Sequence, residues 1–166
     1  MKLLATVFGA LVLAGSAASA PDGFRESVRL TPVAQALSVP EARVYCAVDD
    51  TRWVEMLPSE AAPGTDAYTR FSTRSAHLMA WMCQQLEGPA KPLNVRWAKA
   101  LLTFVHETIH LRGIRGEAEA ECTAYRETAK VTILHFGIRN RRTLHKMMDN
   151  VKAIHQAKPA QYQAIC

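Results

Sequence analysis

Residues 93–136 read LNVRWAKALLTFVHETIHLRGIRGEAEAECTAYRETAKVTILHF, and most of the expected architecture follows from this segment. Between residues 93 and 111 neither proline nor glycine occurs, and apolar residues recur at steps of three and four, as an amphipathic helix requires. Gly113 is expected to end that helix. A second helix is predicted over residues 117–136, where Gly137 stops it. The segment therefore predicts two consecutive helices joined by a short turn.

Residues 106–110 of the first predicted helix read HETIH, which matches the pattern HExxH. His106 and His110 stand four residues apart, so their rings project from one helix face and can both reach one metal ion. Glu107 lies beside that position, where a carboxylate can take a proton from a water activated by zinc. Chance gives roughly 0.013 such patterns in a chain of this composition, which favours a metal site over two exposed histidines on an ordinary helix.

The third protein ligand of a catalytic zinc site is expected from the acidic start of the second helix. Glu117 and Glu121 lie four residues apart and share a helix face, whereas Glu119 should face water. One glutamate of the pair would bind zinc, and the other would hydrogen-bond a ligand histidine. The alternative is that they are ordinary first-turn acids, which any helix favours. Tyr125, one turn beyond Glu121, is a candidate oxyanion stabiliser or a purely structural tyrosine.

The combination of HETIH with the following E-x-x-x-E resembles the zincin metallopeptidases. In the gluzincin branch, HExxH is followed by a ligand Glu in E-x-x-x-D; by that match Glu117 takes the ligand place and Glu121 the place of the Asp. HETIHLRG is also similar to the start of the metzincin pattern HExxHxxGxxH, and departs from it at Gly116, where the third His would stand. The chain resembles, too, small secreted bacterial HExxH proteins of unassigned activity. The resemblance implies a Zn²⁺ site, a helix-rich core with a small sheet, and peptide hydrolysis.

The first twenty residues, MKLLATVFGALVLAGSAASA, have the layout of a secretory signal peptide. Lys2 precedes the apolar residues 3–14, and small residues follow. Ala18 and Ala20 form an A-x-A cleavage site, with a cut after Ala18 as the competitor. The alternative is a short buried N-terminal helix. The signal-peptide interpretation predicts a secreted or periplasmic protein that keeps no integral membrane segment after the signal is removed.

Four cysteines, Cys46, Cys83, Cys122 and Cys166, remain in the mature chain. Export predicts that they form two disulfide bonds. Three pairings are possible, and we favour Cys46–Cys83 with Cys122–Cys166, because a bridge to the last residue would tie down a terminus that otherwise frays. Their spacing matches no cysteine-type zinc site.

The rest of the chain predicts a small sheet and a third helix. Residues 21–42, which contain three prolines, are expected to form an irregular N-terminal arm. Residues 43–57 indicate either a β-hairpin or one strand leading into a short helix. An extended segment is expected near residues 68–79, and a helix over residues 143–156. His77 is expected at the edge of the core or on the surface, with the lining of a cleft as the alternative.

The composition limits the classes of partner. The formal net charge is +5 and hydrophobic residues make up 49% of the chain, which argues against disorder. The cations near the C-terminus have no interleaved aromatic residues, so a solvated helix face is favoured over a nucleic-acid surface. We expect a peptide or protein substrate and no nucleic-acid partner; the sequence does not indicate an oligomeric state.

These patterns together predict an α+β protein with a minimal zincin-like metal-binding domain over residues 43–166. His106, His110 and Glu117 would bind zinc, Glu107 would act as general base, and the segment near residues 68–79 would hold a peptide as an added strand. One alternative is a non-catalytic, zinc-stabilised binding module of the secreted protein. Another is a small structural or envelope-interacting domain in which HETIH is incidental.

Overall fold

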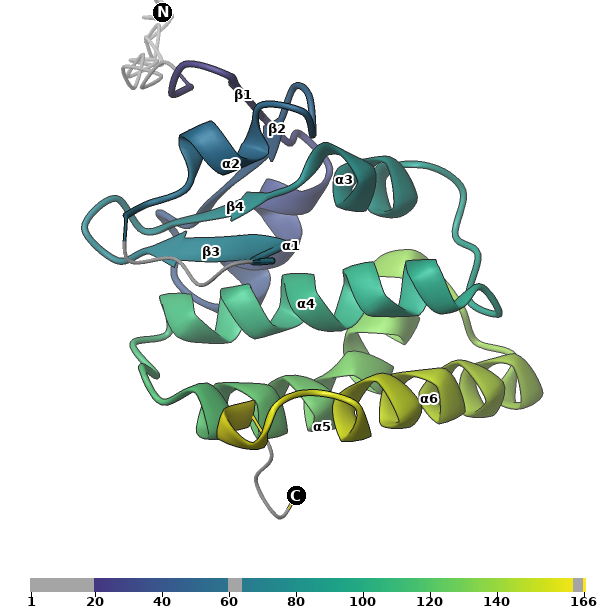
Figure 1. The fold of residues 1–166 in the computed structure, drawn as a ribbon. Coiled ribbons are helices and arrows are strands. Elements are labelled where there is room, and N and C mark those ends of the chain that lie inside the picture. Colours follow the sequence, from purple (N-terminus) through teal and green to yellow (C-terminus); the bar gives the residue numbers. More distant parts are fainter. Residues whose placement is uncertain (1–19, 60–63, 163–165) are drawn as a thin grey trace, which may run out of the picture.

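The computed structural model of the chain describes residues 20–59, 64–162 and 166 (Figure 1). Within this part, a four-stranded sheet from the N-terminal half packs against helices from the C-terminal half. The predicted α+β class is confirmed, with a sheet rather than a lone hairpin. The predicted signal peptide lies outside the described residues except for Ala20. None of the described helices is both long and apolar enough to cross a bilayer.

The sheet contains β1 (Phe24–Glu26), β2 (Arg43–Ala47), β3 (Ala67–Arg70) and β4 (Ser75–Leu78), in the spatial order β1-β2-β4-β3. β1 runs antiparallel to β2, β2 parallel to β4, and β4 antiparallel to β3. β3 therefore forms one edge of the described sheet. It lies beside the long helix α4 (Val95–Leu111), as Figure 1 shows.

The two faces of the sheet meet different partners, because successive side chains of a strand point to opposite faces. Val44 belongs to the face that joins the main core with α4. Tyr45 and Tyr68 belong to the other face, which packs with the short helix α2 (Trp53–Met56). Residues 43–57 thus form a strand followed by a short helix, which is the second of the two arrangements that the sequence indicated.

The expectation of an irregular arm over residues 21–42 is wrong for much of that segment, which contains β1 and the helix α1 (Leu30–Leu37). Pro32 is tolerated because it stands in the first turn of α1, where a missing N–H breaks no intrahelical hydrogen bond. Ser27 Oγ accepts a hydrogen bond of 3.0 Å from the N–H of Leu30 at the helix start. The buried residues of α1 do recur at helical spacing, a signal that the three prolines obscured.

Within the described residues, four further α-helices follow in chain order: α3 (Ala80–Glu87), α4, α5 (Glu117–Phe136) and α6 (Arg141–Gln156). The three long helices predicted from the sequence are confirmed, with starts that differ by at most two residues. Asn94 caps α4, since its Oδ1 accepts hydrogen bonds from the next turn. α4 is central: it contacts the sheet on one side and α5 and α6 on the other (Figure 1). This position buries nearly all of its second half, including HETIH.

Both predicted disulfides are present, in the favoured pairing. Cys46–Cys83 joins β2 to α3, and Cys122–Cys166 joins α5 to the last residue of the chain. Two disulfides fit an extracellular protein, because reducing compartments keep most thiols free.

His77 does not line a cleft, because strand alternation points it to the α2 face of the sheet. It is 1% exposed, and its ring stacks on Tyr68 and meets Phe24 edge-on. Its Nε2 lies 3.0 Å from Ser75 Oγ, while Nδ1 has no hydrogen-bond partner among the described residues. Burial, with a smaller effect of the Arg70 charge, lowers the pKa of His77 from 6.5 to about 4.

We expect His77 to make the protein less stable as pH falls from about 6.5 toward 4. The unfolded chain takes up a proton in that range and the folded chain does not, so folding loses at most about 3 kcal/mol. His77→Phe should remove this part of the pH dependence, measured as the free energy of unfolding in urea at pH 7 and pH 5. His145→Gln, at an exposed position, is the control and should keep it. Equal pH dependence in wild type and His77→Phe would contradict the assignment.

Candidate metal centre

The turn between α4 and α5 decides where the acidic residues of α5 lie. Gly113 has φ of +96°, a conformation that residues with a side chain rarely adopt, and its N–H donates to the carbonyl of His110 at 2.8 Å. The chain then reverses, and α5 begins at Glu117 and packs along α4 (Figure 1). The first turn of α5 therefore faces the end of α4 that carries HETIH.

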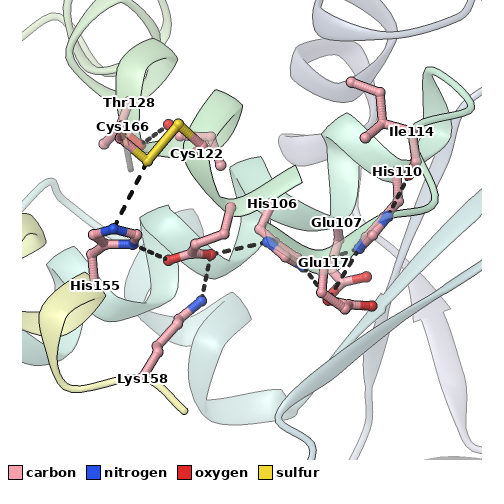
Figure 2. Close-up of polar contacts among 12 residues, drawn as sticks. His106, Glu107, His110, Ile114, Glu117, Cys122, Thr128, His155, Lys158 and Cys166 are labelled. Carbon is pink, nitrogen blue, oxygen red and sulfur yellow. Dashed lines mark hydrogen bonds and ion pairs between the residues drawn. A yellow bond between two sulfur atoms is a disulfide. The ribbon is translucent and has the colours of Figure 1, made fainter. Parts of the chain in front are cut away.

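Two imidazoles and one carboxylate converge at this place (Figure 2). Glu117 Oε2 lies 3.1 Å from His106 Nε2 and 3.5 Å from His110 Nε2, and the two Nε2 atoms are 3.0 Å apart. Both histidine side chains are 5% exposed, whereas that of Glu117 is 44% exposed, so the group is buried on the histidine side and open on the carboxylate side. Two nitrogens and one oxygen are a donor set that catalytic zinc uses, with a fourth position free for water or substrate.

The second nitrogen of each histidine also lies close to an oxygen atom. His110 Nδ1 donates to the carbonyl of Ile114 at 2.6 Å, which directs the lone pair of Nε2 toward the cluster. His106 Nδ1 lies 3.0 Å from Oε2 of Glu121, whose carboxylate is fully buried. Glu121 thus lies on the Nδ1 side of His106, away from the cluster, whereas Glu117 lies close to the Nε2 atoms of both histidines. This arrangement fits the sequence alternative in which Glu117 is the ligand and Glu121 supports a ligand histidine.

The charges of the site favour a cation. Burial alone would lower the pKa of His106, but the carboxylates of Glu117 and Glu121 outweigh it and raise that pKa to about 9. The two histidines in turn hold the pKa of Glu117 well below its usual range. Burial would raise the pKa of Glu121, yet His106 and Lys158 lower it. The same negative field that stabilises protons on the imidazoles would stabilise a divalent ion among them.

Glu107 is positioned from the sheet. Thr69 of β3 donates from its hydroxyl to Glu107 Oε2 at 2.8 Å and lies 3.0 Å from the Glu107 carbonyl oxygen. The Glu107 residue is 6% exposed and lines the same cleft as the two histidines. Sequence reasoning missed Thr69, although strand alternation gives a signal: Ala67 belongs to the face that joins α4, so Thr69 does too.

The cluster opens into a cleft of about 620 Å³ that is lined by β3, α4, the start of α5 and the segment after α6. Tyr162 lines this cleft, and its ring centroid is 5.9 Å from that of His106. Of the two roles that the sequence left open for Tyr125, oxyanion stabiliser or structural residue, the structure favours the structural one. Tyr125 stacks on His155 at 5.3 Å and is not among the residues that line the cleft. As it follows Glu121 by one turn, it shares the face of α5 that His155 of α6 covers.

Residues that precede and follow Tyr162 in the chain are both bonded to α5. Before it, Lys158 Nζ lies 2.6 Å from Glu121 Oε2. After it, Cys166 forms the disulfide with Cys122, the residue next to Glu121 (Figure 2). The short 3₁₀ helix Ala160–Tyr162 is therefore held over the metal centre by an ion pair and a covalent bond. In the sequence, only the favoured Cys122–Cys166 pairing could have indicated that the C-terminal segment returns to α5.

Comparisons of this chain with family models, with curated proteins and with solved structures found no match. The assignment of a metal centre therefore rests on the residues and their geometry alone. His106, His110 and Glu117 form the candidate ligand set, Glu121 contacts a ligand from outside it, and Glu107 and Tyr162 face the cleft beside it.

Proposed function

We propose that this protein is a zinc-dependent peptidase that works outside the cytoplasm, either secreted or in a periplasm. The observation that carries the proposal is the convergence of two imidazoles and one carboxylate at the wall of an open cleft, with a further carboxylate held beside them. A purely structural metal site is usually closed by four protein ligands, whereas here the described residues offer three. The two disulfides favour an extracytoplasmic location.

The proposed mechanism divides the work among residues of the cleft. His106, His110 and Glu117 would hold zinc, which supplies the Lewis acidity that activates water and a peptide carbonyl at neutral pH. Glu107 accepts the proton of the attacking water and delivers it to the leaving amine. Thr69 holds the Glu107 carboxylate through its hydroxyl. Tyr162 donates a hydrogen bond to the oxygen on which negative charge develops.

The position of β3 supports an extended peptide as substrate. β3 forms one edge of the described sheet, and three of its residues, Ala67, Tyr68 and Thr69, line the cleft. A strand at a sheet edge offers unpaired backbone groups to an added strand. A peptide bound in this way would run past Glu107.

A non-catalytic, zinc-stabilised binding module is the second candidate, because the same donors join α4 to α5. In that case the metal would contribute folding energy by linking the two helices. The half-exposed carboxylate of Glu117 and the open cleft favour the peptidase.

We expect the protein to bind zinc with a stoichiometry of one and to cleave members of a broad peptide library. Glu107→Gln should keep the zinc and lose at least about a hundredfold in turnover, since it removes the base and leaves the ligands. Glu119→Gln, at an exposed position in the first turn of α5, is the matched control and should retain activity. Zinc binding without turnover by any of these proteins would favour the binding module, and absence of stoichiometric zinc would contradict both proposals.

Substitution of the two glutamates should distinguish their roles. Glu117→Ala should abolish tight zinc binding, because it removes a ligand. Glu121→Gln should weaken zinc binding by about 10- to 100-fold, because it removes no ligand but weakens the contact that supports His106, along with those to His155 and Lys158. Zinc affinity measured by competition with a chelating dye would check this, with Glu119→Ala as the control. Equal zinc retention by the Glu117 and Glu121 variants would refute the ligand assignment.

Tyr162→Phe should lower kcat by about a hundredfold with little change in zinc affinity, since it removes a hydrogen-bond donor and keeps the ring. Tyr125→Phe should leave kcat unchanged, because that ring packs on His155 outside the cleft. Steady-state kinetics with any peptide that the wild type cleaves would compare the two variants. A larger loss of kcat in Tyr125→Phe than in Tyr162→Phe would overturn the assignment.

A further inference from the structure

A second hollow, of about 310 Å³, adjoins the metal cleft. Three arginines, Arg74, Arg112 and Arg115, line it together with Phe71 and a few aliphatic residues, and we call it the arginine pocket. No acidic side chain is among the described residues that line it. Phe71 and Arg115 line the metal cleft as well, so the two hollows meet at these side chains.

Two of the three guanidinium groups are already paired. Arg74 lies 2.7 Å from Glu41, and both side chains are more than half exposed. Arg112 binds both carboxylate oxygens of Glu127, at 2.6 and 2.8 Å. These acids lie outside the lining of the pocket and balance two of its positive charges. The positive charge of Arg115 is not balanced by either of these acids.

Arg115 is held beside the metal centre without an ion-pair partner among residues 20–59, 64–162 and 166. Its guanidinium lies over the ring of Phe71, 4.9 Å from the centroid. The same ring makes a T-shaped contact with the ring of His110, with 6.1 Å between the centroids. One aromatic ring therefore separates the free cation from a candidate zinc ligand.

The other cations of the metal cleft are not free in this way. Lys99 pairs with Asp66, and Lys158 pairs with the buried Glu121. An incoming anion can therefore bind Arg115 without displacing a carboxylate of the described residues. A guanidinium is also suited to this task, because it binds a carboxylate through two parallel hydrogen bonds.

We propose that the arginine pocket is a substrate subsite for a carboxylate and that Arg115 determines this specificity. The substrates would be peptides with a carboxylate near the scissile bond, supplied either by an acidic side chain or by a free C-terminus. This inference rests on the proposed function, since it names the substrate class of the same cleft. Arg115 would bind the carboxylate, and the aliphatic residues that line the pocket would contact the apolar atoms next to it.

The test compares two pools of short peptides that differ only at one fixed central position, which is Glu in one pool and Gln in the other. Each pool is prepared with a free and with an amidated C-terminus. Cleavage is followed by mass spectrometry for wild type, Arg115→Gln and Arg96→Gln. Arg96 is a matched control because it also lies over an aromatic ring, that of Trp81, but does not line either hollow.

We expect the wild type to cleave peptides that carry the carboxylate at one of these two places about tenfold better in kcat/KM than their neutral counterparts. Arg115→Gln should lose that preference. A preference for Glu over Gln identifies an acidic side chain, and a preference for free over amidated ends identifies a terminal carboxylate. Arg96→Gln should keep the wild-type ratio. Cleavage by the wild type with no carboxylate preference, or with a preference that Arg115→Gln keeps, would overturn this inference and leave the peptidase proposal intact.

A second measurement does not depend on turnover. Fluorescently labelled Glu and Gln peptides are titrated into zinc-loaded Glu107→Gln protein, with and without Arg115→Gln, and binding is followed by anisotropy. Tighter binding of the carboxylate peptide that Arg115→Gln abolishes supports the subsite, even where the wild type cleaves nothing and the peptidase proposal fails. Equal affinity for all four peptides, those with Glu or Gln at the central position and with free or amidated ends, overturns the subsite.

Discussion

A carboxylate with no exposed surface, that of Glu121, connects the parts of this protein that surround the candidate metal centre. A buried charge is tolerated only when partners replace the water that it has lost. Glu121 has three such partners: Nδ1 of His106 in α4, Nδ1 of His155 in α6 and Nζ of Lys158 beyond α6. One residue of α5 thereby sets the positions of two helices and of the C-terminal segment. The disulfide between the neighbouring Cys122 and Cys166 joins the last residue of the chain to the same part of α5.

Charge is distributed unevenly along the surface that a substrate would meet. Glu107 and Glu117 place negative charge beside the two histidines, which suits a divalent cation. The adjoining arginine pocket carries no acidic side chain among the described residues that line it, and Phe71 lines both hollows. A substrate with a carboxylate at one point and a polarised carbonyl at another would match both hollows. Such complementarity contributes more to specificity than to overall affinity.

Much of the centre could be predicted because it lies within single helices. The four-residue spacing of His106 and His110, and that of Glu117 and Glu121, follow from helix geometry, and both pairs do share a face. The same rule made Tyr125 a candidate for the oxyanion role, beside the structural role that the structure favours. It shares a face with Glu121, but that face is the one covered by His155, and not the side that meets the cleft.

The sequence by itself determined the three long helices and the histidine pair with its adjacent glutamate, and it limited the candidates for the third ligand to Glu117 and Glu121. It did so because these depend on periodicity over a few residues. Only the tertiary structure decided that Thr69 would hold Glu107, that Tyr162 would cover the site and that Arg115 would remain unpaired among the described residues. Those contacts join elements far apart in the chain. They depend on how the sheet, the glycine turn and the C-terminal disulfide pack together, which no local pattern encodes.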